Sequence, residues 1–386
     1  MNLEVQRLRA YNFFYFSILS MFISFLPVYL SFRGIAPGEL GLLVGIGSFI
    51  GILSQPFWGM LSDRAKTLKR IILITVGCSV VIGFLLFTSS QFLVLLFLVA
   101  AMYFFLMPTD PLTESLNYRV AENHQISFGS IRTYGAIGFA TSSLVIGWMV
   151  DLWGMESLAW LFVGYGVLTF GFCLFVPDAP ASSKKLSFQD LKQFFFYPRT
   201  LRFFLLVLLV STPHRTNDSF LGVYVQSLGG TTGEVGQAWF LAAVSEVVFF
   251  AISTWVLRRW SEMRLIMIAS ALYTLRYVLC AIAPSPDWVV YLQISQGITF
   301  VIFYTASIQY LYRIIPEEWK ATGQTVLAVL FFGISGIVGS IAGGWVFQQI
   351  GGDALYWAMA CFSFAAFLYS LLLRAKLTDQ TECSHQ

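Results

Sequence analysis

Charge is scarce in this sequence. Of its 386 residues, only 11% are Asp, Glu, Lys or Arg, whereas a globular domain in water carries about 25%. The surface of the folded chain must therefore face something other than water, which excludes an ordinary soluble enzyme. The formal net charge is only +3 and is dispersed along the chain, which also excludes the dense basic face that nucleic-acid binding requires.

Cysteine and histidine are also few. The five cysteines form no CxxC pair and no paired pattern between loops, so we interpret them as small apolar fillers and expect no metal site, disulfide or cofactor. The sequence has no HExxH motif, no P-loop, and no nucleophile with histidine and acid at catalytic spacing. These absences argue against an enzyme and against an ATP-driven pump.

Apolar residues dominate what remains, at 57% of the chain and a mean hydropathy of +0.74. A membrane-spanning helix takes about 20 apolar residues. Windows of this kind, bounded by charge or by Gly and Pro, predict twelve spans at residues 10–32, 38–61, 70–88, 91–116, 127–150, 157–177, 202–228, 234–257, 264–284, 287–312, 321–349 and 353–373. The first run has no small-residue cleavage site, so we expect a span and not a signal peptide.

The longest polar stretch lies almost at the midpoint of the chain. We therefore predict an all-α membrane protein with a six-helix bundle at 1–177, a cytoplasmic linker at 178–198, and a second bundle with a short tail at 199–386. Lys and Arg near the ends of the spans gather on one face, with only Arg33 on the other. Because basic loops stay inside, we expect a cell-membrane protein with both termini in the cytoplasm.

An internal repeat supports two related halves. Gly38-Glu39-Leu40-Gly41 opens the second predicted span, and Gly233-Glu234-Val235-Gly236 opens the eighth, 195 residues later. Asp63-Arg64 and Arg258-Arg259 close the same two spans at the same offset. Parallel six-helix repeats of this kind relate the two halves of major facilitator transporters, in which the substrate site lies between the halves.

The segment Gly59-Met60-Leu61-Ser62-Asp63-Arg64, followed by Lys69-Arg70, resembles the loop between the second and third helices of the major facilitator superfamily. The resemblance implies that Asp63 and Arg64 latch the two halves together on the cytoplasmic side. The alternative is a plain basic loop in which Asp63 caps a helix.

Four further segments resemble the phenylpropionate permease group and its relatives, the nucleoside:proton symporters and lactose permease. They are Pro111-Leu112-Thr113-Glu114, Phe128-Gly129-Ser130-Ile131-Arg132-Thr133-Tyr134-Gly135, Ser245-Glu246-Val247 and Leu275-Arg276-Tyr277. The resemblance implies that Glu114 and Arg132 form the pair at the substrate site, that Glu246 serves substrate binding or proton coupling, and that the protein is a monomer.

Independently of any family, eight ionisable residues lie well inside predicted spans. A charge in hydrocarbon costs a few kcal/mol or more, so each should face a cavity and find a partner. Four acids and three arginines nearly balance, as a polar cavity between two bundles requires. The eight are Asp110, Glu114, Arg132, His214, Arg215, Asp218, Glu246 and Arg276.

Asp110 and Glu114 are four residues apart and share one helix face. Two carboxylates this close in low dielectric do not both ionise easily, so we expect one to hold a proton while Arg132 neutralises the other and offers donors to the solute. The alternative is a static salt bridge that joins the fourth and fifth spans. Asp110 departs from the pattern of the phenylpropionate group, where an apolar residue is expected.

The seventh span departs from that pattern as well. Arg215 and Asp218 have the spacing of an ion pair on one helix. Alternatively, they act with His214 and Asn217 to bind a solute richer in hydroxyl groups, such as a sugar or nucleoside. Asp218 is also a candidate for proton coupling. Glu246 and Arg276 lie at similar depth in adjacent spans, where Arg276 is the expected structural partner. Tyr134 and Trp239 either stack on the solute or pack against lipid and protein.

Together these patterns predict a secondary transporter that imports a small polar organic solute (a sugar, nucleoside or aromatic carboxylate) with a proton by alternating access. The alternative within the same superfamily is a proton-driven exporter of drugs or metabolites. A non-transporting receptor or membrane enzyme fits less well, because the linker and tail leave little room for a signalling output.

Overall fold

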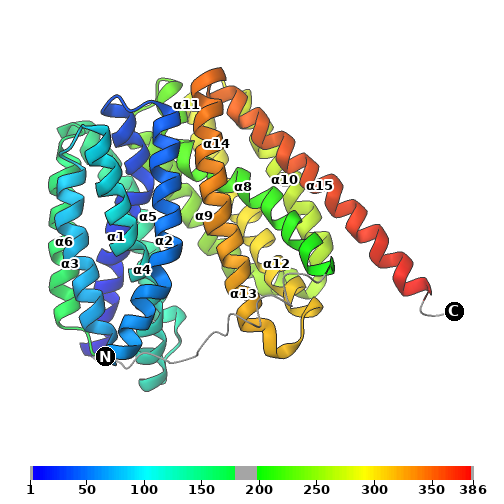
Figure 1. Ribbon diagram of the computed structural model, residues 1–386, viewed down its shortest axis with the longest axis horizontal. Helices are drawn as coiled ribbons and strands as arrows, with labels where there is room; N and C mark the ends of the chain where they lie inside the picture. The colour runs from blue at the N-terminus through cyan, green and yellow to red at the C-terminus, as the bar shows by residue number, and fades with distance from the viewer. Residues whose placement is uncertain (1–2, 179–197, 384–386) are drawn as a thin grey trace.

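Long α-helices make up nearly all of the computed structural model, which describes residues 3–178 and 198–383 (Figure 1). The N-terminal half comprises α1 (Leu3–Phe32), α2 (Pro37–Ala65), α3 (Leu68–Leu86), α4 (Phe92–Asn123), α5 (Gly129–Trp153) and α6 (Ser157–Leu174). The C-terminal half comprises α8 (Pro198–Ser227), α9 (Thr232–Arg259), α10 (Glu262–Ala281), α11 (Pro286–Leu292), η1 (Gln293–Ser295), η2 (Gly297–Val301), α12 (Ile302–Ile314), η3 (Glu317–Trp319), α13 (Lys320–Ala328), η4 (Val329–Ile334), α14 (Ser335–Ile350) and α15 (Gly352–Cys383).

The predicted all-α membrane fold is confirmed. Eleven helical stretches of the described chain are long and apolar enough to cross a membrane, counting α11 to α12 and α13 to α14 as one stretch each. The twelfth is α8, whose 30 residues include the polar run from His214 to Asp218 and therefore have low hydropathy. This helix packs against α1, α14 and α15, so protein and not lipid surrounds much of its length.

Some helices extend beyond the predicted spans by one or two polar turns. α1 begins at Leu3, seven residues before the predicted start, and α4 continues to Asn123, seven residues beyond the predicted end. A helix does not stop where its apolar run stops, because its polar turns continue into the interface. The predicted linker at 178–198 lies outside the described residues except for its ends, where Asp178 accepts hydrogen bonds from the Thr67 hydroxyl and the Lys69 amide, at 2.6 Å and 3.1 Å.

The repeated Gly-Glu-x-Gly segments have the same structural role in both halves. Each glutamate accepts a hydrogen bond from the backbone amide of the residue that precedes its helix, Glu39 from Ala36 at α2 and Glu234 from Thr231 at α9. Thr231 returns the bond through its hydroxyl and completes a capping box, which Ala36 cannot do. The flanking glycines let each helix approach the opposite half, because a Cβ on Gly41 would collide with the Ser340 carbonyl and a Cβ on Gly236 with the Ser143 carbonyl. The sequence repeat therefore marks two equivalent contacts between the halves.

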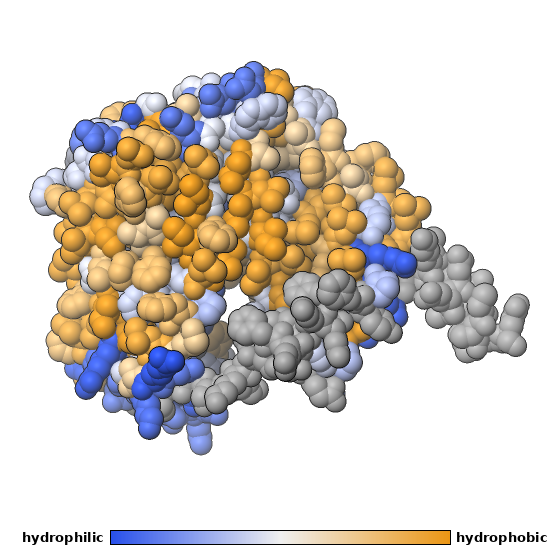
Figure 2. Space-filling model, viewed as in Figure 1, coloured by the Kyte–Doolittle hydropathy of each residue, from blue (hydrophilic) through white to orange (hydrophobic). Residues whose placement is uncertain are grey.

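Those contacts, α2 with α14 and α5 with α9, close one side of the molecule. Toward the side of the N-terminus the two halves diverge in Figure 1, and the space-filling view shows a hollow between them there. The outer surface between the two polar ends is a broad hydrophobic band (Figure 2), as expected for a bilayer-facing wall. The structure is therefore closed on one side of the membrane and open on the other.

A charged contact joins the halves on the closed side. Asp151, in the last turn of α5, accepts hydrogen bonds from the amides of Thr232 and Gly233 at the start of α9, at 2.9 Å and 2.8 Å. A carboxylate is favoured there because the first amides of a helix lack partners and carry partial positive charge. At the equivalent contact of the repeat, the neutral Gln348 accepts from the Gly38 amide at 2.9 Å. The two halves of the gate thus differ in charge.

Replacing Asp151 with alanine is expected to open this gate. Loss of the carboxylate lowers the stability of the closed conformation by about 1 kcal/mol. The population of the conformation that is open on this side therefore rises roughly fivefold. In a cysteine-free background, electron spin distance measurements between labels at the exposed positions Leu152 and Trp288 will show a larger long-distance fraction. Gln348→Ala, which removes only a neutral acceptor, should change the distribution less. Equal responses of the two variants would contradict a special role for the carboxylate.

Candidate functional site

In the N-terminal half, α4 and α5 hold an acid–arginine pair. Arg132 Nε forms an ion pair with Glu114 Oε1, and both side chains remain partly exposed, at 37% and 28%. The guanidinium of Arg132 also lies over the Phe16 ring of α1, 4.1 Å from its centroid, a cation–π contact that fixes its orientation. The structure thus brings together the two residues that the resemblance implied for the substrate site.

Asp110 lies one helical turn before Glu114 on α4. None of the ion pairs among the described residues includes it, and its buried Oδ1 has no hydrogen-bond partner. The nearby Tyr15 hydroxyl is also buried and unbonded. One carboxylate of the pair is therefore matched by Arg132, while the other is poorly suited to carry a charge unless it binds a proton or a ligand.

In the C-terminal half, α8 carries an ion pair of its own. Arg215 Nη1 lies 2.7 Å from Asp218 Oδ2, and His214 Nε2 lies 3.6 Å from the same oxygen. His214 is 3% exposed, stacks on Phe300 with centroids 4.9 Å apart, and contacts the Tyr273 hydroxyl through Nδ1 at 3.2 Å. His214 is therefore enclosed within the C-terminal bundle. The Arg215–Asp218 pair has formed, as its helical spacing predicted.

Arg276 on α10 does not pair with Glu246 on α9. Its guanidinium, in a residue only 2% exposed, instead donates to the side chains of Gln296, Gln293 and Thr299. The predicted pairing of Arg276 with an acid is therefore wrong, and its neutral partners were not predicted from the sequence. The available signal was a pair of glutamines one turn apart in an otherwise apolar span.

Three other predicted site residues lie in different surroundings. Trp239 of α9 faces Phe139 of α5 across the two halves, with ring centroids 6.2 Å apart and an interplanar angle of 67°, and its buried indole N–H has no partner. Tyr134 is 39% exposed beneath the Arg9 guanidinium, apart from the acid–arginine pair. Asn217 is 2% exposed and accepts a hydrogen bond from the Tyr356 hydroxyl at 3.0 Å, within the C-terminal bundle.

Asp63 and Arg64 end α2 on the open side of the molecule, where both are exposed. Neither takes part in an ion pair with any residue that the structure describes. The halves are apart on this side (Figure 1), so the implied latch is not formed in this conformation and stays a prediction.

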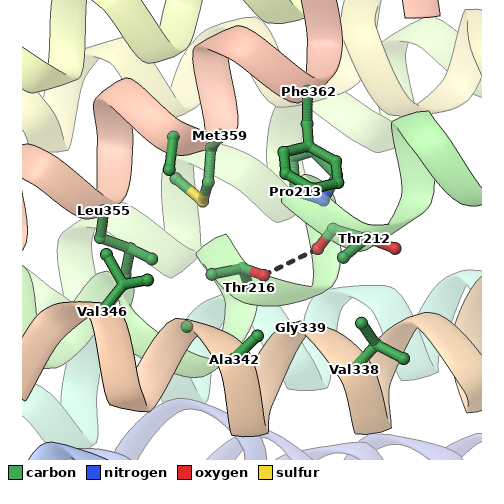
Figure 3. Close-up of a pocket in the computed structure, with 12 residues that line it drawn as sticks. Thr212, Pro213, Thr216, Val338, Gly339, Ala342, Val346, Leu355, Met359 and Phe362 are labelled. Atoms are coloured by element: carbon green, nitrogen blue, oxygen red, sulfur yellow. Dashed lines mark hydrogen bonds between the residues drawn. The ribbon is translucent and has the colours of Figure 1, made fainter. Parts of the chain in front are cut away.

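A separate cleft lies between α8, α14 and α15 (Figure 3). Its walls are mostly methyl, methylene and aromatic groups, with Val338, Met359 and Phe362 among them. The Thr216 hydroxyl at its floor donates to the Thr212 carbonyl at 2.8 Å. The cleft holds none of the charged residues described above, so it suits an acyl chain and not a polar solute. Within the described ranges, no three His, Cys, Asp or Glu side chains gather as a metal site would require.

Comparison with known proteins places nearly the whole chain in one family. The model of the MFS_1 like family matches residues 5–358. A maltose permease of Geobacillus stearothermophilus is 25% identical, with 95% of this chain and 94% of that protein covered. A probable 3-phenylpropionic acid transporter of Escherichia coli is also 25% identical, with 98% and 99% covered. The multi-drug resistance efflux pump PmrA of Streptococcus pneumoniae is 23% identical, with 95% of each chain covered.

The solved structures show the same fold. The crystal structure of the nucleoside transporter NupG superposes with a TM-score of 0.84 at 18% identity, covering 97% of this chain and 99% of that one. The family match, the helical architecture and the two related halves agree. The chain belongs to the MFS_1 like family and is a multi-pass membrane transporter of the major facilitator superfamily, not an enzyme.

Proposed function

We propose that this transporter is a proton-coupled symporter of a small polar organic solute. The observation that carries the proposal is that two acids well inside the spans, Asp110 on α4 and Glu246 on α9, form no ion pair with any described residue, although the neighbouring acid Glu114 pairs with Arg132. A proton that binds either acid changes the net charge of the site between the halves. Such a change can bias which side of the transporter is open.

The conformation fits one stage of alternating access. With the N-terminus and linker in the cytoplasm, as the basic loops predict, the hollow between the halves faces inward and the α2–α14 and α5–α9 contacts close the outside. Rocking of the two halves about the site would exchange these positions. We place the protein in the cell membrane as a monomer, with lipid as its surroundings and no cofactor beyond the coupling ion.

The chemistry of the site suits a solute that combines a flat ring or sugar with hydrogen-bonding groups. Arg132 offers a planar fork of donors, while Trp239 and Phe139 present aromatic faces and an unbonded indole N–H. The relatives named for maltose, nucleosides and 3-phenylpropionic acid have solutes of this description. Sugars, nucleosides and aromatic carboxylates are therefore the classes to test.

Proton-driven export is the second candidate, because one relative along the whole chain is named as an efflux pump. Exporters of drugs need an amphiphile site, whereas here the charged residues gather between the halves and the apolar cleft of Figure 3 lies elsewhere. Import is therefore the better fit.

The test uses proteoliposomes that contain the purified protein. Labelled maltose, uridine and 3-phenylpropionate are each supplied outside with an inward proton gradient, and one class should accumulate until a protonophore is added. An inward sodium gradient at equal pH should drive no accumulation. Ethidium extrusion with no accumulation of any of the three solutes would favour the exporter.

A further inference from the structure

Arg276 is a buried cation held entirely by neutral groups. Its Nη1 donates to Gln296 Oε1 and, at 3.4 Å, to Thr299 Oγ1, and its Nη2 donates to Gln293 Oε1. No carboxylate of the described residues lies within ion-pair distance. A buried charge with no counter-ion is costly, so its field must be used or offset through the groups that it touches.

The two glutamines differ in where their amide nitrogens point. Arginine is only a donor, so each carboxamide must turn its oxygen to Arg276 and its NH2 group away. The NH2 group of Gln293 donates a hydrogen bond to the Val289 carbonyl, one turn earlier in the same span, at 2.9 Å. Gln296 is 3% exposed, and its carboxamide lies next to the Glu246 carboxylate of α9. Only Gln296 thus connects the cation to the acid.

The backbone fixes this contact. The Gly297 amide donates to the Ser245 hydroxyl at 3.0 Å, and a Cβ on Gly297 would collide with the Ser245 carbonyl. Because Ser245 precedes Glu246 and Gly297 follows Gln296, the close approach of the two helices brings the acid and the amide together. The π-helical turn from Gly297 to Val301 starts here, and such turns are frequent at functional sites.

We propose that Gln296 is a positioning residue that transmits the positive charge of Arg276 to Glu246. The cation polarises the carboxamide, which strengthens its NH2 group as a donor to the carboxylate. The other charged groups whose fields reach Glu246 are Asp218 of α8 and Arg132 of α5. Gln296 thereby holds the deprotonated side chain of Glu246 within the C-terminal half. Protonation of Glu246 removes this attraction and frees its side chain. The inference rests on the coupling role proposed for Glu246.

The test titrates the carboxyl groups of the purified, full-length protein in lipid by infrared spectroscopy, without any solute. The Glu246 band is identified by its absence from Glu246→Gln. Gln296→Met and Gln293→Met each remove one amide from Arg276 at similar volume. We expect Gln296→Met to move the midpoint of the Glu246 band about one unit to higher pH, the tenfold change that follows loss of a hydrogen bond to a charged group. Gln293→Met should move it much less.

Equal midpoints in the two methionine variants would overturn the proposal. If these variants are not recovered in folded form, Gln296→Glu and Gln293→Glu keep an acceptor on Arg276. There, Gln296→Glu should raise the midpoint more than Gln293→Glu, and equal shifts would again overturn it. Solute uptake by the wild type that is independent of the proton gradient would instead contradict the proposed function, and proton-coupled uptake that survives Glu246→Gln would contradict only the coupling role of Glu246. The failures are therefore distinguishable.

Discussion

Arg132→Ala is expected to lower solute uptake at least thirtyfold. The substitution leaves Glu114 and Asp110 one turn apart with no cation beside them and removes the donor fork from the site. Truncating one partner of a hydrogen-bonded charge pair costs 2–5 kcal/mol, and the lower end, about 2 kcal/mol, applies to a pair that is partly exposed. The measurement is the initial rate of labelled uptake in proteoliposomes with matched protein content.

Two variants control for this result. Arg132→Lys keeps the charge but not the planar fork, so its uptake should fall between that of the wild type and that of Arg132→Ala. Arg258→Ala removes an exposed arginine at the end of α9 and should leave uptake unchanged. Arg132→Ala should also insert into the membrane as well as wild type. Wild-type uptake by Arg132→Ala would remove this residue from the site and leave its contact with Glu114 as a static bridge.

Glu246→Gln is expected to uncouple the solute from the proton. With one pH unit across the membrane, a symporter that moves one proton per solute can accumulate its solute about tenfold, since one unit is worth 1.36 kcal/mol. The variant should reach only equal concentrations on both sides. Exchange of labelled for unlabelled solute should continue, because it needs no net proton movement. Steady-state accumulation and exchange are measured in the same vesicles.

The matched control is Glu234→Gln on the same helix. Glu234 closes the capping box at the start of α9, where its carboxylate accepts a hydrogen bond from the Thr231 amide at 2.6 Å. Its loss should lower stability slightly and leave tenfold accumulation intact. Accumulation by Glu246→Gln equal to that of wild type would show that the coupling acid lies elsewhere, with Asp110 the next to test.

Much of the fold follows from one-dimensional patterns. The number and order of the spans depend on apolar runs, and the Gly-Glu-x-Gly repeat at Gly38 and Gly233 anticipated two related halves. The charged gate did not follow from these patterns. Asp151 is an ordinary acid at the end of a span, and its contact with α9 depends on how closely Gly147 and Gly236 let the helices approach.

The candidate site was predictable where it is local. The Arg215–Asp218 pair follows from helical spacing, and the pairing of Glu114 with Arg132 was implied by resemblance. The partners of Arg276 were not predictable, because depth along a span does not say which way a side chain points. The irregular turns around Gln296 rotate that helix in a way that no regular 3.6-residue pattern contains. The exposed position of Tyr134 was not predicted either, because its depth along α5 does not show which way its side chain points.

Proton movement that accompanies solute movement is the central claim of this account. The direct measurement uses proteoliposomes loaded with a pH-sensitive dye at equal pH on both sides, to which maltose, uridine and 3-phenylpropionate are added in turn. We predict that one class acidifies the lumen as it enters, and that Glu246→Gln, shown to be folded, gives no such signal. Entry of labelled solute with no acidification would contradict the central claim, and the same acidification in Glu246→Gln would assign the coupling proton to another acid.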